Sequence, residues 1–169
     1  MIRIVIAEDQ KMLLGAIGAL LNLEDDIEVV GQASNGKEAI ELVKELRPDI
    51  CIMDVEMPIM TGLEAAEQLK SDSSKLVILT TFARDGYFQR AMDNDVRGYL
   101  LKDSPSEELV AAIRCIAGGK RIYSPELLDD CTHNKELLAV DSKPEGNITV
   151  QTVKSYIHTM MDKIKLPTG

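Results

Sequence analysis

The sequence predicts an α/β protein with a doubly wound, five-stranded parallel sheet, followed by a partial all-α segment. The first observation is a set of short apolar runs rich in Ile, Val and Leu, which is typical of strands buried on both faces of a parallel sheet. The second is that these runs alternate with stretches of helical periodicity, as in repeated βα units. The third is the residue type at which four of the runs end, namely Glu8-Asp9, Asp54, Thr80 and Lys102.

The individual elements follow from apolar periodicity and from turn residues. Strands are expected at 2–7, 27–33, 50–53, 76–80 and 98–101, and helices at 11–23, 36–46, 61–71, 85–94 and 105–118. Asn35-Gly36 marks the turn before the second helix, and Pro48 ends that helix. Ser104 is the expected cap of the fifth helix, Pro105 fits its first turn, and Gly118-Gly119 closes it.

The four strand ends predict one polar site. In the flavodoxin-like strand order 2-1-3-4-5 the first and third strands are neighbours, which places Glu8 and Asp9 beside Asp54. Three carboxylates held together repel one another, and oxygen ligands on a half-open site suit Mg²⁺, or Mn²⁺ in its place. An aspartate beside such an ion can attack phosphorus and form an aspartyl-phosphate. The Lys102 ammonium and the Thr80 hydroxyl would then offset charge on the phosphoryl oxygens.

Residues 1–118 resemble the receiver domain of two-component response regulators, because five motifs agree in order and spacing. The resemblance implies that Asp54, within the run 52–58, is the phosphoacceptor. It implies a metal site formed by Glu8, Asp9, Asp54 and the backbone carbonyl of Glu56. It implies that the phosphoryl-binding and switch residues are Thr80, Tyr99 and Lys102. Whether the peptide bond after Lys102 is cis, as Lys-Pro bonds often are in this family, is left open by the sequence.

The rest of the chain is similar to the NarL/LuxR type of response regulator. The similarity rests on Lys102-Asp103-Ser104, on the run 119–127 and on Thr152-Val153-Lys154. It implies a linker with a partial helix at 119–147 and a fragment of a LuxR-type helix-turn-helix DNA-binding domain at 148–169. The residues expected to face DNA are Lys154, Ser155 and His158, with Lys163 and Lys165 near the phosphate backbone.

The helix-turn-helix segment is incomplete by comparison with its family. The supporting helix before Ile148 and a last helix after Leu166 have no counterpart. A lone recognition helix cannot bury its apolar stripe. Either the output domain is truncated, or intervening residues are absent from this chain.

Two helices carry too little charge for helices that face water. No residue of 12–23 is charged, and Arg114 is the one charged residue of 109–118. Because both helices should cover the same face of the sheet, a joint apolar patch predicts an interface. We expect a homodimer, formed on phosphorylation, through Leu13, Leu14, Ile17, Leu21, Val110 and Ile113.

Composition narrows the function classes. The net charge of −9 over 169 residues argues against nucleic-acid binding by the whole surface. The three cysteines lack metal-site spacing and are expected to be idle thiols. Met1 leads directly into a strand, and the longest uncharged stretch is too short for a bilayer span, so we expect a cytoplasmic protein without direct membrane association.

The resemblance implies a transcription regulator that a sensor histidine kinase phosphorylates and that binds promoter DNA. The alternative is a receiver-only protein that signals through protein contacts and carries a vestigial tail. A hydrolase is a third class, but hydrolases of this chemistry usually place the nucleophile after the first strand and add a cap domain. We therefore expect that the protein is not an enzyme.

Overall fold

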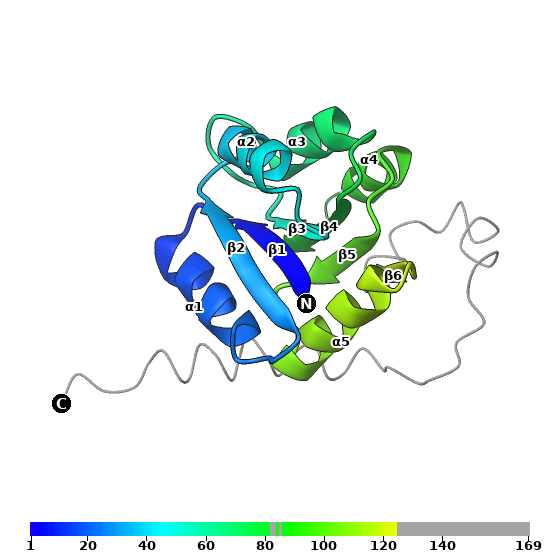
Figure 1. Cartoon of the computed structure of the whole chain (residues 1–169). Coiled ribbons are helices and arrows are strands. Elements are labelled where there is room, and N and C mark those ends of the chain that lie inside the picture. Colours follow the sequence, from blue (N-terminus) through cyan, green and yellow to red (C-terminus); the bar gives the residue numbers. More distant parts are fainter. Residues whose placement is uncertain (82–83, 85, 125–169) are drawn as a thin grey trace.

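The computed structural model describes residues 1–81, 84 and 86–124, and the expected helix-turn-helix segment lies outside this part of the chain. Strands and helices alternate from the first residue onward (Figure 1). The strands are β1 (Ile2–Ala7), β2 (Ile27–Ala33), β3 (Ile50–Met53), β4 (Lys75–Thr80), β5 (Gly98–Leu101) and β6 (Ile122–Tyr123). The helices are α1 (Lys11–Leu21), α2 (Gly36–Leu46), α3 (Gly62–Leu69), α4 (Tyr87–Asp93) and α5 (Ser106–Ala117).

The described strands form one parallel sheet in the order β2-β1-β3-β4-β5-β6. The expected doubly wound fold with the order 2-1-3-4-5 is therefore confirmed, and β6 is an addition to it. The sequence predicted a linker for the residues of β6. A two-residue strand has no measurable period, so the sequence gives no signal for it.

The bounds of α2 agree with the expectation, and the ends of the other helices lie within two residues of it; at the start of α5 the structure shows the cause of the difference. Ser104 does not cap this helix. Pro105 holds the capping position with an extended backbone and makes no side-chain cap bond, so the helix begins one residue later, at Ser106. The expected end at Gly118-Gly119 holds, because Gly118 is the C-cap and Gly119 has a φ of 96°. The described residues contain no cis peptide bond, so the bond after Lys102 is trans.

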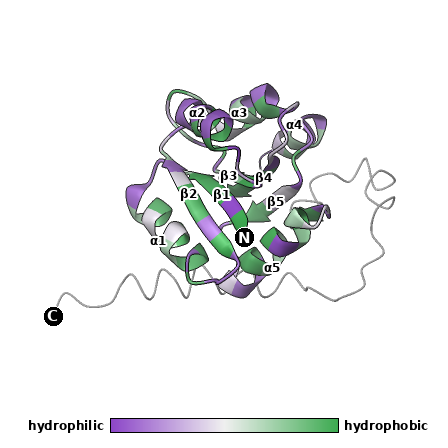
Figure 2. Ribbon diagram, viewed as in Figure 1, coloured by the Kyte–Doolittle hydropathy of each residue, from purple (hydrophilic) through white to green (hydrophobic). Residues whose placement is uncertain are grey.

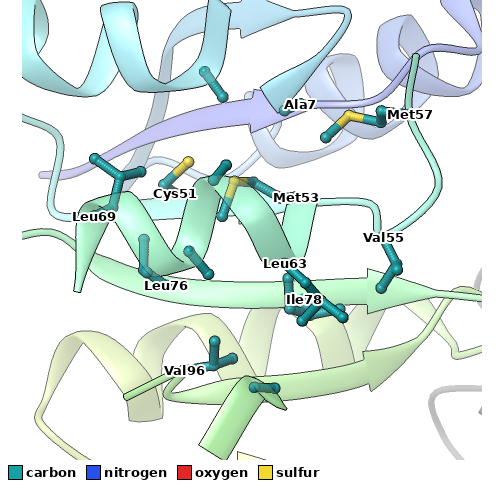
Figure 3. Close-up of a cluster of buried hydrophobic side chains, with 14 of the residues drawn as sticks. Ala7, Cys51, Met53, Val55, Met57, Leu63, Leu69, Leu76, Ile78 and Val96 are labelled. Carbon is teal, nitrogen blue, oxygen red and sulfur yellow. The ribbon is translucent and has the colours of Figure 1, made fainter. Parts of the chain in front are cut away.

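Two apolar layers hold the helices on the sheet. Helices α1 and α5 cover one face, and α2, α3 and α4 cover the other (Figure 1). Figure 3 shows the layer under α3, where Leu63 and Leu69 pack over Cys51, Met53 and Ile78. Both faces of the central strands are thus buried, which explains their uninterrupted apolar sequence. No helix of the described residues has the length and apolarity needed to span a membrane.

Candidate phosphoryl-transfer site

The three carboxylates expected at the sheet edge do lie together. Glu8 and Asp9 follow β1, Asp54 follows β3, and these neighbouring strands pair up to Ala7 and Met53. One oxygen from each carboxylate can be chosen so that all three lie within 4.8 Å of one another. Glu8 and Asp54 are buried, whereas Asp9 is exposed. The cluster therefore has two inner oxygen donors and one that faces solvent.

The loop after Asp54 is held by close backbone approaches. The amide of Asp54 donates to Ala7 O at 3.0 Å, which extends the β1–β3 ladder by one residue. A Cβ on Gly62 would lie 2.0 Å from the backbone oxygen of Asp54, so only glycine fits there. Gly36 is equally constrained, because its amide donates to Met60 O and a Cβ would lie 2.7 Å from that oxygen. These contacts fix the backbone that presents the Asp54 carboxylate.

Lys102 enters the cluster from the end of β5. Its ammonium pairs with Glu8 Oε2 and lies 3.0 Å from Asp54 Oδ2. Its backbone amide donates to Thr80 O at 2.7 Å, so the ends of β4 and β5 are fastened together at this point. The side chain of Lys102 is itself buried. One cation is therefore shared between two buried carboxylates from two different strands.

Burial governs the electrostatics of this cluster. It raises the pKa of Glu8 and of Asp54 above the ordinary carboxyl values, although Lys102 opposes the rise in both cases. The negative charge of Asp54 adds to the rise in the pKa of Glu8, and that of Asp9 adds to the rise for Asp54. A single ammonium thus does not offset the burial of two carboxylates and the repulsion among three.

The arrangement fits a divalent cation. All donors in the cluster are carboxylate oxygens, the type of ligand that Mg²⁺ prefers, and the exposed Asp9 leaves room for water. The raised carboxyl pKa values indicate the same need for additional positive charge. The carboxylates of this cluster that could hold the ion are those of Glu8, Asp9 and Asp54.

Thr80 and Tyr99, two of the three expected phosphoryl-binding and switch residues, lie in the sheet. Thr80 is the last residue of β4 and is buried. Tyr99 lies in the middle of β5, is fully buried, and packs its ring edge-to-face against Phe88 of α4 with centroids 5.7 Å apart. Tyr99 therefore lies within the core on the side of α4, three residues before Lys102, whose amide binds Thr80 O.

Sequence reasoning missed the neighbours of Glu56. The exposed Glu56 carboxylate accepts a hydrogen bond from Tyr87 Oη at 3.2 Å and pairs with Arg84 at 3.3 Å. These contacts join the loop after β3 to the start of α4. No periodic signal reports them, because both partners lie in or next to a connecting loop about thirty positions away in the sequence.

The same loop holds a strained residue that the sequence did not reveal. Ile59 has a φ of 68°, and the amide of Met60 donates across it to Pro58 O at 2.7 Å. A left-handed backbone is unfavourable for a β-branched side chain. Ile59 is also 80% exposed, so it recovers little through burial.

The expected dimer residues divide into two groups. Ile17, Leu21, Val110 and Ile113 are buried under α1 and α5 in the core of a single chain, which corrects their assignment to a surface. Leu13 and Leu14 are half-buried, and α1 has little strongly hydrophilic surface beyond its first residues (Figure 2). The exposed Met12, Gly15 and Ala19 complete the outer side of α1. The DNA-facing residues Lys154, Ser155 and His158 lie outside the described residues.

Comparison with known proteins identifies the family to which the chain belongs. Residues 4–114 match the family model for the response regulator receiver domain. The chain is 54% identical to the transcriptional regulatory protein DesR of Bacillus subtilis, with 98% of this chain and 92% of DesR covered. It is 46% identical to the uncharacterized transcriptional regulatory protein YvfU of the same organism, over 97% and 91% of the two chains.

Comparison with solved structures also shows similarity to response regulators. The chain resembles a DNA-binding response regulator of the LuxR family from Staphylococcus aureus, with 42% identity and a TM-score of 0.66 over 69% of this chain and 99% of that one. The alignment with DesR extends over 182 positions, whereas this chain has 169 residues. DesR therefore has residues without a counterpart here.

Proposed function

This chain belongs to the response regulator receiver family, and on that basis we propose that Asp54 accepts a phosphoryl group from a sensor histidine kinase. The phosphorylated protein would then dimerise and regulate transcription by binding promoter DNA. The observation that carries the proposal is the contact of Lys102 with both Glu8 and Asp54, because it brings three strand ends to one reacting carboxylate.

The proposed reaction is a phosphoryl transfer to a carboxylate. An oxygen of Asp54 forms a bond to phosphorus while the bond between phosphorus and the donor imidazole nitrogen breaks, and the imidazole leaves with the bonding electrons. The Lys102 ammonium and the Thr80 hydroxyl bind the phosphoryl oxygens and offset their charge. A Mg²⁺ or Mn²⁺ ion held by Glu8, Asp9, Asp54 and the backbone carbonyl of Glu56 would supply further positive charge.

The site also explains why a phosphoryl group would change the rest of the molecule. Lys102 now pairs with Glu8 and Asp54, and a phosphoryl group on Asp54 would offer it a doubly charged partner instead. Thr80 would turn toward the same group. Because Lys102 and Thr80 are joined through the backbone, both strand ends would respond together, and we propose that the Tyr99 side chain follows.

The test of phosphorylation uses acetyl phosphate with Mg²⁺ and the intact mass of the protein. Wild-type protein is expected to gain one phosphoryl group, and Asp54→Asn is expected to gain none. Asp25→Asn is the matched control, because Asp25 is an exposed aspartate in the loop between α1 and β2. Phosphorylation of Asp54→Asn at the wild-type rate would refute the assignment of Asp54.

The proposed dimer surface is the outer side of α1 together with α5. With four of the expected residues in the core, Leu13 and Leu14 are the expected residues left to make contact. Leu14→Asp should abolish association of the phosphorylated protein in sedimentation velocity without unfolding it. Leu42→Asp, at a half-buried position of α2 on the other face, is the matched control and should leave association intact.

The output step is proposed for the residues after 124. A DNA-binding role for Lys154, Ser155 and His158 predicts that phosphorylated full-length protein is retained on promoter DNA, and that Lys154→Ala reduces retention. The alternative is a receiver-only protein that acts through contacts with other proteins, and it predicts no DNA retention in either state. Curated relatives that cover most of this chain are named transcriptional regulators, which favours the first function over the second and over an enzyme.

A further inference from the structure

Strand β6 belongs to a segment, residues 121–124, that fastens onto the outer edge of β5, and we call this segment the clasp. The amide of Ile122 donates to Arg97 O at 3.0 Å, and the amide of Ser124 donates to Tyr99 O at 2.9 Å. The Ser124 hydroxyl oxygen accepts a hydrogen bond from the amide of Leu101 at 3.3 Å. The clasp is therefore bonded along the whole of β5.

The clasp also packs on both faces of the sheet. Ile122 joins the apolar layer under α1 and α5, and Tyr123 joins the layer under α4. The ring of Phe88 lies edge-to-face with Tyr99 and with Tyr123, at centroid distances of 5.7 and 5.6 Å. Tyr99 and Tyr123 are also register partners across the two strands. The proposed switch residue Tyr99 is thus in direct backbone contact with the clasp, and its ring and that of Tyr123 share Phe88 as an aromatic neighbour.

Polar contacts fix the clasp in register. Tyr123 Oη donates to Val96 O at 3.2 Å. Arg121 pairs with Asp95 in the turn before β5 and donates to Tyr123 Oη. These bonds anchor the amino end of the clasp at the turn that starts β5, while Ser124 anchors its carboxyl end.

The parallel direction of β6 decides at which edge of the sheet the clasp ends. Because β5 and β6 run the same way, Ser124 lies at the edge of the sheet that holds the acidic cluster. Its hydroxyl binds the amide of Leu101, the residue before Lys102, and the Lys102 amide in turn binds Thr80 O. Ser124 is therefore connected to Thr80 through a hydrogen bond to its side chain, the Leu101–Lys102 peptide bond and one backbone hydrogen bond.

We propose that phosphorylation of Asp54 reduces how often the clasp opens, and that the clasp in this way couples the phosphorylation site to the residues that follow it in the chain. The inference rests on the proposed function of Asp54. A phosphoryl group held by Thr80 and Lys102 joins the ends of β3, β4 and β5, so the carboxyl end of β5 moves less and the clasp opens less often. By linkage, protein with an open clasp must bind a phosphoryl group more weakly, by the same factor by which the phosphoryl group favours the closed clasp.

The first test is amide hydrogen exchange of the full chain with and without beryllofluoride and Mg²⁺. The amides of Ile122 and Ser124 are expected to exchange at least about 5-fold more slowly when the probe is bound, the lower end of typical coupling between sites. The amides of Ile2 and Ile27, which are bonded at the opposite edge of the sheet, serve as internal controls and should not change. Equal or faster exchange at Ser124 would overturn the proposal.

The second test measures the reciprocal effect. Tyr123→Ala should weaken beryllofluoride binding at least about 5-fold, and Tyr123→Phe should weaken it less, because the ring remains while the hydroxyl bonds are lost. Arg121→Ala removes the ion pair with Asp95 from the exposed side and keeps the test available if Tyr123→Ala does not fold. The matched control is Arg90→Ala, which breaks the ion pair of α4 with Glu67 and does not touch the clasp.

The outcomes separate the two proposals. Fluorine NMR reports whether beryllofluoride is bound, independently of the clasp. If the bound signal is present and Tyr123→Ala, Tyr123→Phe and Arg121→Ala all bind beryllofluoride with wild-type affinity, the clasp is not coupled to the phosphorylation site and the inference is wrong. If wild-type protein gives no bound signal, the proposed function fails, and the inference that rests on it fails with it.

Discussion

Two ion-pair clusters, each of one basic residue, one glutamate and one aspartate, lie at opposite edges of the sheet. Lys102 pairs with Glu8 and Asp54 at the carboxyl ends of the strands. At the other edge, Arg114 of α5 pairs with Glu24 and Asp26 of the loop before β2. The side chains of the first cluster are 2–9% exposed, and those of the second are 37–48% exposed.

The same ion pairing has opposite consequences in the two clusters. Burial raises the pKa of Glu8 and Asp54 despite the ammonium beside them. Hydrogen bonds from Arg114 lower the pKa of Asp26, because solvation of that carboxylate is largely retained. The comparison teaches that the distance between ions does not by itself indicate stabilisation. In the buried cluster Lys102 does not fully offset the negative charge of the carboxylates, so a metal ion can bind there. In the exposed cluster the ion pairs join α5 to the loop before β2.

The largest expected effect separates the two basic residues. Lys102→Met should lower the free energy of unfolding by about 3 kcal/mol in metal-free buffer, because two buried carboxylates lose their shared cation. Arg114→Met removes an equally well-formed contact in water and should lower it far less. Urea denaturation of both variants measures the difference. Equal losses would show that burial does not distinguish the clusters.

Addition of Mg²⁺ should stabilise the protein through the buried cluster alone. At a concentration of 100 times its Kd, an ion that binds only the folded state raises the free energy of unfolding by about 2.7 kcal/mol. Thermal unfolding with and without Mg²⁺ measures this increase. Asp9→Asn should reduce it strongly, and Asp26→Asn should leave it unchanged. A similar reduction in both variants would place the ion elsewhere.

A smaller effect is expected for Asp54→Asn. Folding disfavours the charged form of Asp54. The uncharged amide should therefore raise the free energy of unfolding in metal-free buffer at neutral pH, by about 1 kcal/mol, which is typical of a single stabilising substitution. Denaturant titration measures the gain. Asp26→Asn should instead cause a loss, since folding favours the charge of Asp26. A loss in both variants would contradict the contrast.

The smallest effect is the pH dependence, and its sign differs between the clusters. Glu8 and Asp54 have ordinary carboxyl pKa values of 4.5 and 3.8 that are raised in the folded state. The folded state therefore binds more protons in that window, and stability falls as the pH rises from these values through the raised ones. The contribution of Asp26 is present above pH 3.8 and is lost as the pH falls through its lowered pKa.

The difference in the free energy of unfolding between each variant and the wild type isolates the pH-dependent contribution of the substituted carboxylate. The gain from Asp54→Asn should grow as the pH rises, and the loss from Asp26→Asn should shrink as the pH falls. Unfolding curves at several pH values in metal-free buffer measure both trends. If the signed stability difference from the wild type changes in the same direction with pH in both variants, the directions of the pKa shifts argued above are wrong.

Much of the fold could be predicted because its signals are local. The five long strands appear as apolar runs, and their observed bounds agree with the expected ones to within one residue. The acidic residues could be placed together because the carboxyl ends of parallel strands share an edge. Both arguments need only residue type and order along the chain.

Other features could not be predicted because they depend on partners that are distant in the sequence. Helices α1 and α5 are apolar on more than one stripe, so the pattern did not reveal that Ile17 and Ile113 face the sheet. The two-residue β6 has no period and is defined by its bonds to β5. The contacts of Glu56 with Arg84 and Tyr87 join the loop after β3 to the start of α4, and no periodic rule predicts contacts of a loop residue.

The sequence by itself determined where the five longer strands lie along the chain and which chemical groups follow them, because apolar runs and the residues at their ends can be identified from residue type and position alone. The tertiary structure alone decided how those groups are charged and connected. Burial is a property of the packed chain, and it raises the carboxyl pKa values of Glu8 and Asp54 around one shared Lys102. The clasp likewise exists only once β5 presents a free edge to which residues 121–124 can bond.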